Sequence, residues 1–286
     1  ALSFEAQNGV VNALDSRIHK LRPHRGQMDT AEIILKLLQG SHMTSKQGEI
    51  RVQDAYALRC VPQVHGASKD AINYVKEKIE IEINSVTDNP LVFPDTKEGL
   101  SGGNFHGQPM ALSLDLLGIA LSEIANISER RLERLVNPAL SGLPAFLVEK
   151  GGLNSGFMIV QYSAAALVSE NKVLAHPASV DSIPSSANQE DHVSMGTIAA
   201  RKAKEIMENT RRVLAMELMC ACQAIDLRGN KGLGLGTKAA YELIRKEVDT
   251  LVDDRPLYED INKCEYLITS RKLIEKVESV AGEINF

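Results

Sequence analysis

A polar cluster at residues 53–59, Gln-Asp-Ala-Tyr-Ala-Leu-Arg, contains side chains that could bind an amino acid through its carboxylate. The guanidinium of Arg59 can hold a carboxylate with two parallel hydrogen bonds, which both bind and orient it. Tyr56 lies three residues before Arg59, so one helical turn would place both on one face. The spacing alone favours a plainer interpretation, in which Arg59 forms a surface ion pair with Asp54 beside a half-buried Tyr56.

A second polar cluster, Ser-Ile-Pro-Ser-Ser-Ala-Asn-Gln-Glu-Asp-His, ends at His192. Asn188 suits a helix N-cap, and Asp191 three residues later completes an arrangement like a capping box. Glu190 would then lie in the first turn and complement the helix dipole. Capping does not need Gln189, Glu190 and His192 together, and a helix N-terminus crowded with titratable groups also suits a polar substrate. The sequence leaves both interpretations open.

A Gly-rich turn, Ser-Gly-Gly-Asn-Phe-His at residues 101–106, lies between the two clusters. Gly102 and Gly103 permit backbone dihedrals that let the main chain approach a ligand closely. The alternative is an ordinary loop before a long helix. A second Gly-rich stretch, 229–236, lacks the Gly-Lys-Ser/Thr ending of a phosphate-binding loop and is predicted to be a connector. No metal site is predicted, because metal-ligand spacing is absent among His19, His24, His42, His65 and His176.

The segments beside these clusters, which must hold them in place, mostly show the hydrophobic repeat of a helix. Apolar side chains recur every three or four residues across 108–135 and 155–175. Residues 189–228 contain no Pro and only one Gly. They predict a continuous helix about 60 Å long, which needs packing partners along its whole length. Shorter helices are expected over 27–39, 68–84, 237–251 and 267–281, and strand only in pieces such as 91–93. The sequence therefore predicts an all-α fold, an elongated bundle of long helices.

The composition of the chain limits which classes of protein and partner it fits. Hydrophobic residues make up 44% of the 286 residues, and the net charge of −5 argues against a nucleic-acid partner. No apolar run approaches the roughly 18 residues of a membrane span, and no signal peptide is visible. Cys220 and Cys222 should point to nearly opposite faces of a helix, so reduced and mostly buried thiols in a cytoplasmic protein are expected. The start at Ala1 rather than Met fits an internal start.

The two polar clusters and the Gly-rich turn, in this order, resemble the aromatic amino acid ammonia-lyases almost residue for residue. Further stretches that resemble this family are 17–24, 85–90 and 152–157. The resemblance covers essentially the whole chain but corresponds only to the later part of a family member. It implies a single helical domain over 1–286, the C-terminal part of such an enzyme, with an ammonia-lyase/fumarase-like architecture. It also implies a homotetramer whose active sites take residues from more than one subunit.

The resemblance also implies a cofactor and roles for individual residues. Family members form a methylidene-imidazolone from an Ala-Ser-Gly tripeptide, which this chain does not contain, and take a catalytic Tyr from an N-terminal segment. The chain alone is therefore expected to be inactive. By resemblance, Arg59 would bind the substrate carboxylate, Phe105 would pack against the cofactor, and Glu190 would contact the substrate amino group or imidazole. The implied set is catalytic Tyr56 and Glu190, with substrate-binding Gln53, Arg59, Phe105 and Gln189.

Substrate preference is predicted from Glu190 and His192. Family members that act on phenylalanine tend to carry Gln-Asp at the position of Gln189-Glu190, without a His two residues on. A carboxylate suits a polar imidazole, so the expected reaction is elimination of ammonia from L-histidine to give urocanate. The alternatives are a phenylalanine- or tyrosine-type lyase or aminomutase, and a non-catalytic helical scaffold subunit. A fumarase-like bundle enzyme would carry a Gly-Ser-Ser-x-Met-Pro-x-Lys loop, which is absent.

Overall fold

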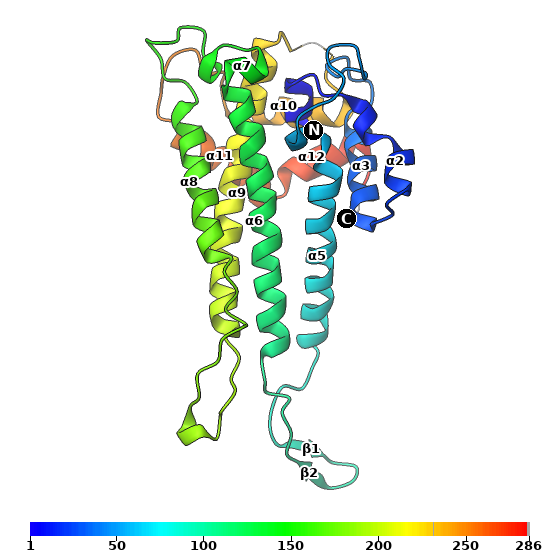
Figure 1. The fold of residues 1–286 in the computed structure, drawn as a ribbon, viewed down its shortest axis with the longest axis vertical. Helices are drawn as coiled ribbons and strands as arrows, with labels where there is room; N and C mark the ends of the chain where they lie inside the picture. Colours follow the sequence, from blue (N-terminus) through cyan, green and yellow to red (C-terminus); the bar gives the residue numbers. More distant parts are fainter. Residues whose placement is uncertain (231, 285–286) are drawn as a thin grey trace.

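Four long helices run side by side in the computed structural model, which describes residues 1–230 and 232–284 (Figure 1). They are α5 (Val61–Glu82), α6 (Gln108–Val136), α8 (Met158–Leu174) and α9 (Gly196–Leu227). α9 packs against α6 along the bundle and also contacts α8 and α11. The predicted all-α bundle of long helices is confirmed.

The shorter helices gather mostly around the end of the bundle drawn at the top of Figure 1. The opposite end carries a small antiparallel hairpin of β1 (Leu91–Phe93) and β2 (Glu98–Leu100), which contains the predicted strand. The remaining elements are α1 (Leu2–Ala6), η1 (Val11–Leu14), α2 (Ser16–Lys20), α3 (Arg25–Leu37), α4 (Tyr56–Arg59), α7 (Pro138–Ser141), η2 (Ala145–Leu147), η3 (Ser186–Asn188), α10 (Leu235–Glu247), α11 (Tyr258–Thr269) and α12 (Lys272–Ala281).

Proline and asparagine set the ends of α6. Pro109 lies in its first turn, where the missing N–H costs no helical hydrogen bond. The helix stops at Val136, because Asn137 adopts an extended conformation and Pro138 cannot continue the hydrogen-bond ladder. The Asn137 side chain then accepts from the Ala139 N–H at 3.1 Å and caps α7.

Several helix predictions were wrong in their bounds, among them the helix expected over 68–84, which is α5 and begins at Val61. The helix expected over 189–228 begins only at Gly196, because residues 186–188 have positive φ and belong to a loop. The helix expected over 267–281 is instead two, α11 and α12, which are separated at Arg271, where φ is 64°. The predicted helix 237–251 ends at Glu247. The predicted connector 229–236 joins α9 to α10, although α10 already begins at Leu235 and Lys231 lies outside the described residues.

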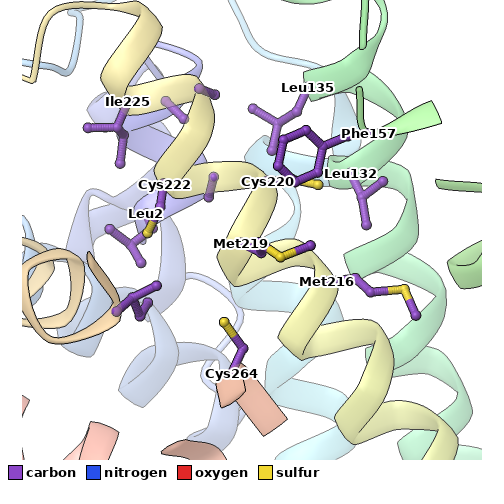
Figure 2. Packing of buried hydrophobic residues seen from close by; sticks show 14 of the residues in the cluster. Leu2, Leu132, Leu135, Phe157, Met216, Met219, Cys220, Cys222, Ile225 and Cys264 are labelled. Atoms are coloured by element: carbon purple, nitrogen blue, oxygen red, sulfur yellow. The ribbon is translucent and has the colours of Figure 1, made fainter. Parts of the chain in front are cut away.

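The main hydrophobic core surrounds the upper half of α9 (Figure 2). Cys220 lies toward Leu132 and Phe157, whereas Cys222 lies on the side of Leu2, so the two thiols point away from each other as predicted. Both are buried and unpaired, as is Cys264, while Cys60 is half-buried. Burial raises the pKa of the Cys222 thiol to about 12, so this side chain packs as a small apolar group and is not a nucleophile.

A buried ion pair joins α6 to α9. Arg131 donates from Nε and Nη2 to the two carboxylate oxygens of Glu217 at 2.5 and 2.7 Å. The hydroxyls of Ser3 and Ser128 donate to the same carboxylate. Burial alone would raise the pKa of Glu217, but the Arg131 charge and these hydrogen bonds outweigh it and lower the pKa to about 2. Removing either partner would leave an uncompensated charge in the core.

Within the described part of the chain, α6 alone has the length and apolar composition that a membrane crossing requires. A central helix of a bundle meets the same criterion, and α6 packs against α5, α8 and α9. It also buries the charged side chains of Asp115, Glu129 and Arg131. These contacts account for its apolar face through packing within the bundle.

Candidate active site

The first polar cluster lies at the upper end of the bundle, on α4 and the segment before it. Asp54 anchors this segment: its buried carboxylate accepts from the Val10 N–H and from Arg51 Nε, each at 2.6 Å. Because Asp54 pairs with Arg51, the surface ion pair proposed between Asp54 and Arg59 is wrong. Tyr56 is 70% exposed, so the half-buried Tyr of that interpretation is wrong as well.

Neighbouring groups fix the orientation of the Arg59 guanidinium, but among the described residues no carboxylate pairs with its charge. Its Nε donates to the backbone carbonyl of Asp54 at 3.0 Å, and its Cζ lies 4.8 Å from the centroid of the Tyr56 ring. Within the described residues, neither Nη atom has a hydrogen-bond partner. The outer edge of the guanidinium therefore presents two parallel N–H donors, the geometry that a carboxylate accepts.

A cavity of about 310 Å³ lies beside this guanidinium. Its lining includes Arg59, Gln53, Cys60 and Gln63. Ligand pockets in proteins usually occupy about 300–1,000 Å³ and carry a few convergent polar groups. The space and its polar lining suit the carboxylate end of an amino acid.

The second polar cluster lies at the opposite end, in the loop 175–195 between α8 and α9. The predicted N-cap role of Asn188 is wrong, because this residue has φ of 67° and α9 starts eight residues later. Glu190 consequently does not occupy a first helical turn. Its Oε2 accepts from the hydroxyls of Ser185 at 2.6 Å and Ser186 at 3.0 Å, which lowers the pKa of the carboxyl. The Oε1 atom faces no donor among the described residues.

The Gly-rich turn lies beside the loop that contains Glu190. Phe105 is 57% exposed, and no atom approaches within 4 Å of the place where a Cβ would lie on Gly102 or Gly103. The imidazole of the next residue, His106, stacks on that of His192 with ring centroids 5.4 Å apart. The turn therefore offers an open aromatic face close to the loop that holds the carboxylate.

The fold brings two of the three predicted groups together and separates the third. Phe105, Gln189 and Glu190 lie on neighbouring loops at the lower end, whereas Gln53, Tyr56 and Arg59 lie at the upper end. The 22 residues of α5 separate the two ends by about 30 Å at 1.5 Å per residue. No group of three or more potential metal ligands occurs in residues 1–230 and 232–284.

Three features of the site were missed in the sequence. His106 was quoted only as the end of the Gly-rich turn, and nothing local links it to a residue 86 positions away. Ser185 and Ser186 were quoted only as members of the second polar cluster, although their spacing of five and four from Glu190 permits a turn that returns both hydroxyls to the carboxylate. The anchoring role of Asp54 depends on Val10 and could not be read from the cluster itself.

Comparison with known proteins decides the family. The sequence model described as aromatic amino acid lyase matches residues 1–246. The chain belongs to the aromatic amino acid lyase family. Histidine ammonia-lyase from Alkaliphilus oremlandii is 69% identical over 278 residues, which are 97% of this chain and 55% of that protein. Histidine ammonia-lyase from Clostridium tetani is 65% identical, again over 97% of this chain and 55% of that protein.

Solved structures of a histidine ammonia-lyase and a tyrosine aminomutase have the same fold. The crystal structure of histidine ammonia-lyase from Trypanosoma cruzi matches with a TM-score of 0.90 and 48% identity, over 97% of this chain and 52% of that one. A tyrosine aminomutase from Streptomyces globisporus matches with a TM-score of 0.93 and 39% identity, over 98% of this chain and 57% of that one. The chain spans about half the length of the curated relatives it matches.

Proposed function

We propose that this chain forms the C-terminal part of a histidine ammonia-lyase, which eliminates ammonia from L-histidine to give urocanate. The proposal rests on two oppositely charged side chains, each of which still has hydrogen-bonding capacity for a substrate. Among the described residues, the two Nη donors of the Arg59 guanidinium have no partner and can bind a carboxylate, and one oxygen of the Glu190 carboxylate is open to an ammonium or an imidazole N–H. Relatives that are named histidine ammonia-lyase and are up to 69% identical to this chain support histidine as the substrate.

The separation of these groups supports an active site shared between copies. A single histidine is far too short to contact both Arg59 and Glu190 of one chain across about 30 Å. An antiparallel arrangement of copies would place the upper end of one beside the lower end of another, as closed symmetry allows. The proposed assembly is a cytoplasmic homotetramer. Each copy would contain residues 1–286 as a single helical domain, joined to the N-terminal part of the same enzyme.

Each residue has a proposed role within the shared site. Arg59 binds the substrate carboxylate, with Tyr56 and Gln53 beside it. Glu190, with Gln189 next to it, accepts a hydrogen bond from the amino group or the imidazole. Because the hydroxyls of the loop lower the pKa of Glu190, the carboxylate is ionised at neutral pH and acts as an acceptor.

The methylidene-imidazolone of this family would have to come from outside this chain, which contains no Ala-Ser-Gly. The residues of the Gly-rich turn fit such a group, since Phe105 exposes an aromatic face and Gly102 and Gly103 leave open space beside it. We propose that Phe105 packs against the flat ring. When bound, the group supplies an electrophile that captures the substrate and eases the departure of ammonia.

A second candidate is an aminomutase, which the similarity to tyrosine aminomutase from Streptomyces globisporus favours. The two functions differ in substrate and product, so one assay separates them. The complete protein that contains this chain is incubated with L-histidine, L-tyrosine and L-phenylalanine, and the products are separated by chromatography. Urocanate from histidine, lost in Arg59→Ala and kept in Arg25→Ala, supports the proposal. A β-amino acid from tyrosine or phenylalanine, without urocanate from histidine, contradicts it.

A further inference from the structure

A pair of histidines ties the two loops at the lower end of the bundle, and the proposed catalytic roles do not use it. His106 Nε2 lies 3.1 Å from the backbone carbonyl of His192 and 3.4 Å from its Nδ1. The two imidazoles are stacked with 25° between their planes. His106 directly follows Phe105, and His192 lies two residues after Glu190. The contact therefore links the two loops that contribute to the proposed site.

The hydrogen bonds define which nitrogen of His106 carries the proton. The backbone N–H of Gln108 points at Nδ1 of His106 at 3.3 Å, so Nδ1 acts as the acceptor. The proton is then on Nε2, which donates to the carbonyl of His192. In this neutral tautomer, one ring joins the first residue of α6 to the loop 175–195.

The start of the loop is anchored where the Ser179 N–H donates to Asp115, but the internal hydrogen bonds of the tip 183–192 do not fix the position of that tip. Ser186, Ala187 and Asn188 have φ of 51°, 53° and 67°, a left-handed run that residues with a side chain rarely adopt. The hydrogen bonds of Glu190 all come from Ser185 and Ser186 within the loop, so they shape it without placing it. Among the described residues, the hydrogen bonds between the tip 183–192 and the rest of the protein all involve His106.

We infer that His106 is a positioning residue, which holds the tip 183–192 of the loop so that Glu190 faces the substrate. The inference rests on the proposed function of Glu190. His106 itself does not touch the reacting atoms, and it acts through the carbonyl of His192. An imidazole suits this role because it accepts from the start of α6 on one edge and donates to the loop on the other.

Kinetics of the complete enzyme test the inference. His106→Ala should lower kcat for histidine about 10-fold or more with little change in KM, because a misplaced carboxylate loses its transition-state contact. His106→Gln, whose amide can donate to the same carbonyl, should recover most of kcat. In a Glu190→Gln background, His106→Ala should change kcat by less than about twofold, since the positioned group is already lost. The exposed His24, at the start of α3, supplies the control His24→Ala, which should match the wild type.

Hydrogen exchange of the same variants gives a readout that does not depend on turnover. The Ser185 and Glu190 amides are paired within the tip, and His106→Ala should accelerate their exchange while the exchange of α9 is unchanged. Two results would overturn the inference. One is a His106→Ala enzyme whose kcat stays within about twofold of wild type. The other is a His106→Ala change that lowers kcat as much in the Glu190→Gln background as in the wild type. If the wild-type enzyme does not convert histidine, the proposed function fails. In that case, unchanged hydrogen exchange of the tip amides in His106→Ala would still refute the role of His106 in positioning the loop.

Discussion

Replacing Arg59 by Ala should separate binding of the substrate from stability of the fold. Within the part of the chain that the structure describes, Arg59 donates from Nε to the carbonyl of Asp54 and stacks on the exposed ring of Tyr56. Losing them should cost about 1–2 kcal/mol of unfolding free energy. The two Nη donors have no hydrogen-bond partner among the described residues, so the effect of losing them should appear mainly with substrate. A charge-assisted bidentate contact is expected to contribute on the order of 2–4 kcal/mol, or roughly 30- to 1,000-fold in kcat/KM.

The assay compares steady-state kinetics with urea unfolding for the complete enzyme and three variants. Arg59→Lys should also be poor, because an ammonium keeps the charge without the two parallel donors. Arg25→Ala is the matched control, since Arg25 is an exposed arginine paired with Asp29 on α3. A value of kcat/KM within about twofold of wild type in Arg59→Ala would mean that Arg59 is a surface side chain and that the carboxylate assignment fails.

Three further predictions concern Glu190, Glu217 and the isolated chain. Glu190→Gln should lower kcat on histidine by tens-fold or more and shift substrate preference toward phenylalanine or tyrosine. The melting temperature should change little, because the amide oxygen can still accept from Ser185. Unchanged turnover of histidine would show that Glu190 does not belong to the site. Glu217, with a pKa of about 2 in the fold against an ordinary 4.5, contributes roughly 3 kcal/mol of stability that is present above about pH 4.5 and lost as the pH falls toward 2. Glu217→Gln should therefore destabilise the protein by about 3 kcal/mol or more at pH 7, and progressively less toward pH 3, in urea titrations; a loss under about 1 kcal/mol at pH 7 would refute this pairing. The purified chain 1–286 should give no urocanate from histidine, and product formed without another polypeptide would show that the missing tripeptide is dispensable.

The long helices could be predicted because the pattern that indicates a helix lies within the helix's own sequence. In α6, apolar residues repeat at helical spacing, and the Asn137-Pro138 pair marks the end. The start of α9 could not be predicted in the same way. Residues 189–195 contain neither Gly nor Pro, and the left-handed turn before them is set by contacts of Ser185 and Glu190 with each other. Propensity alone continues the helix through this loop.

The residues of the candidate site were proposed from their types and from the family resemblance, but their arrangement could not be predicted. Asp54 illustrates the limit: sequence proximity paired it with Arg59, whereas the fold gives it Arg51 and the backbone of Val10. The contact of His106 with His192 arises because α6 and α9 both begin at the lower end of the bundle, and no pattern within either segment encodes that. The separation of Arg59 from Glu190 likewise follows from the direction of α5.

The central claim is that the active site forms between copies, and mixed oligomers test it most directly. Arg59→Ala and Glu190→Gln chains of the complete enzyme, carrying different affinity tags, are co-expressed, and oligomers with both tags are purified. Each variant alone should be nearly inactive. In the mixed oligomers about a quarter of the sites should combine an intact Arg59 from one copy with an intact Glu190 from another, and activity should return in that proportion. Mixed oligomers as inactive as the two parents would show that both residues serve a site within one chain and would contradict the account.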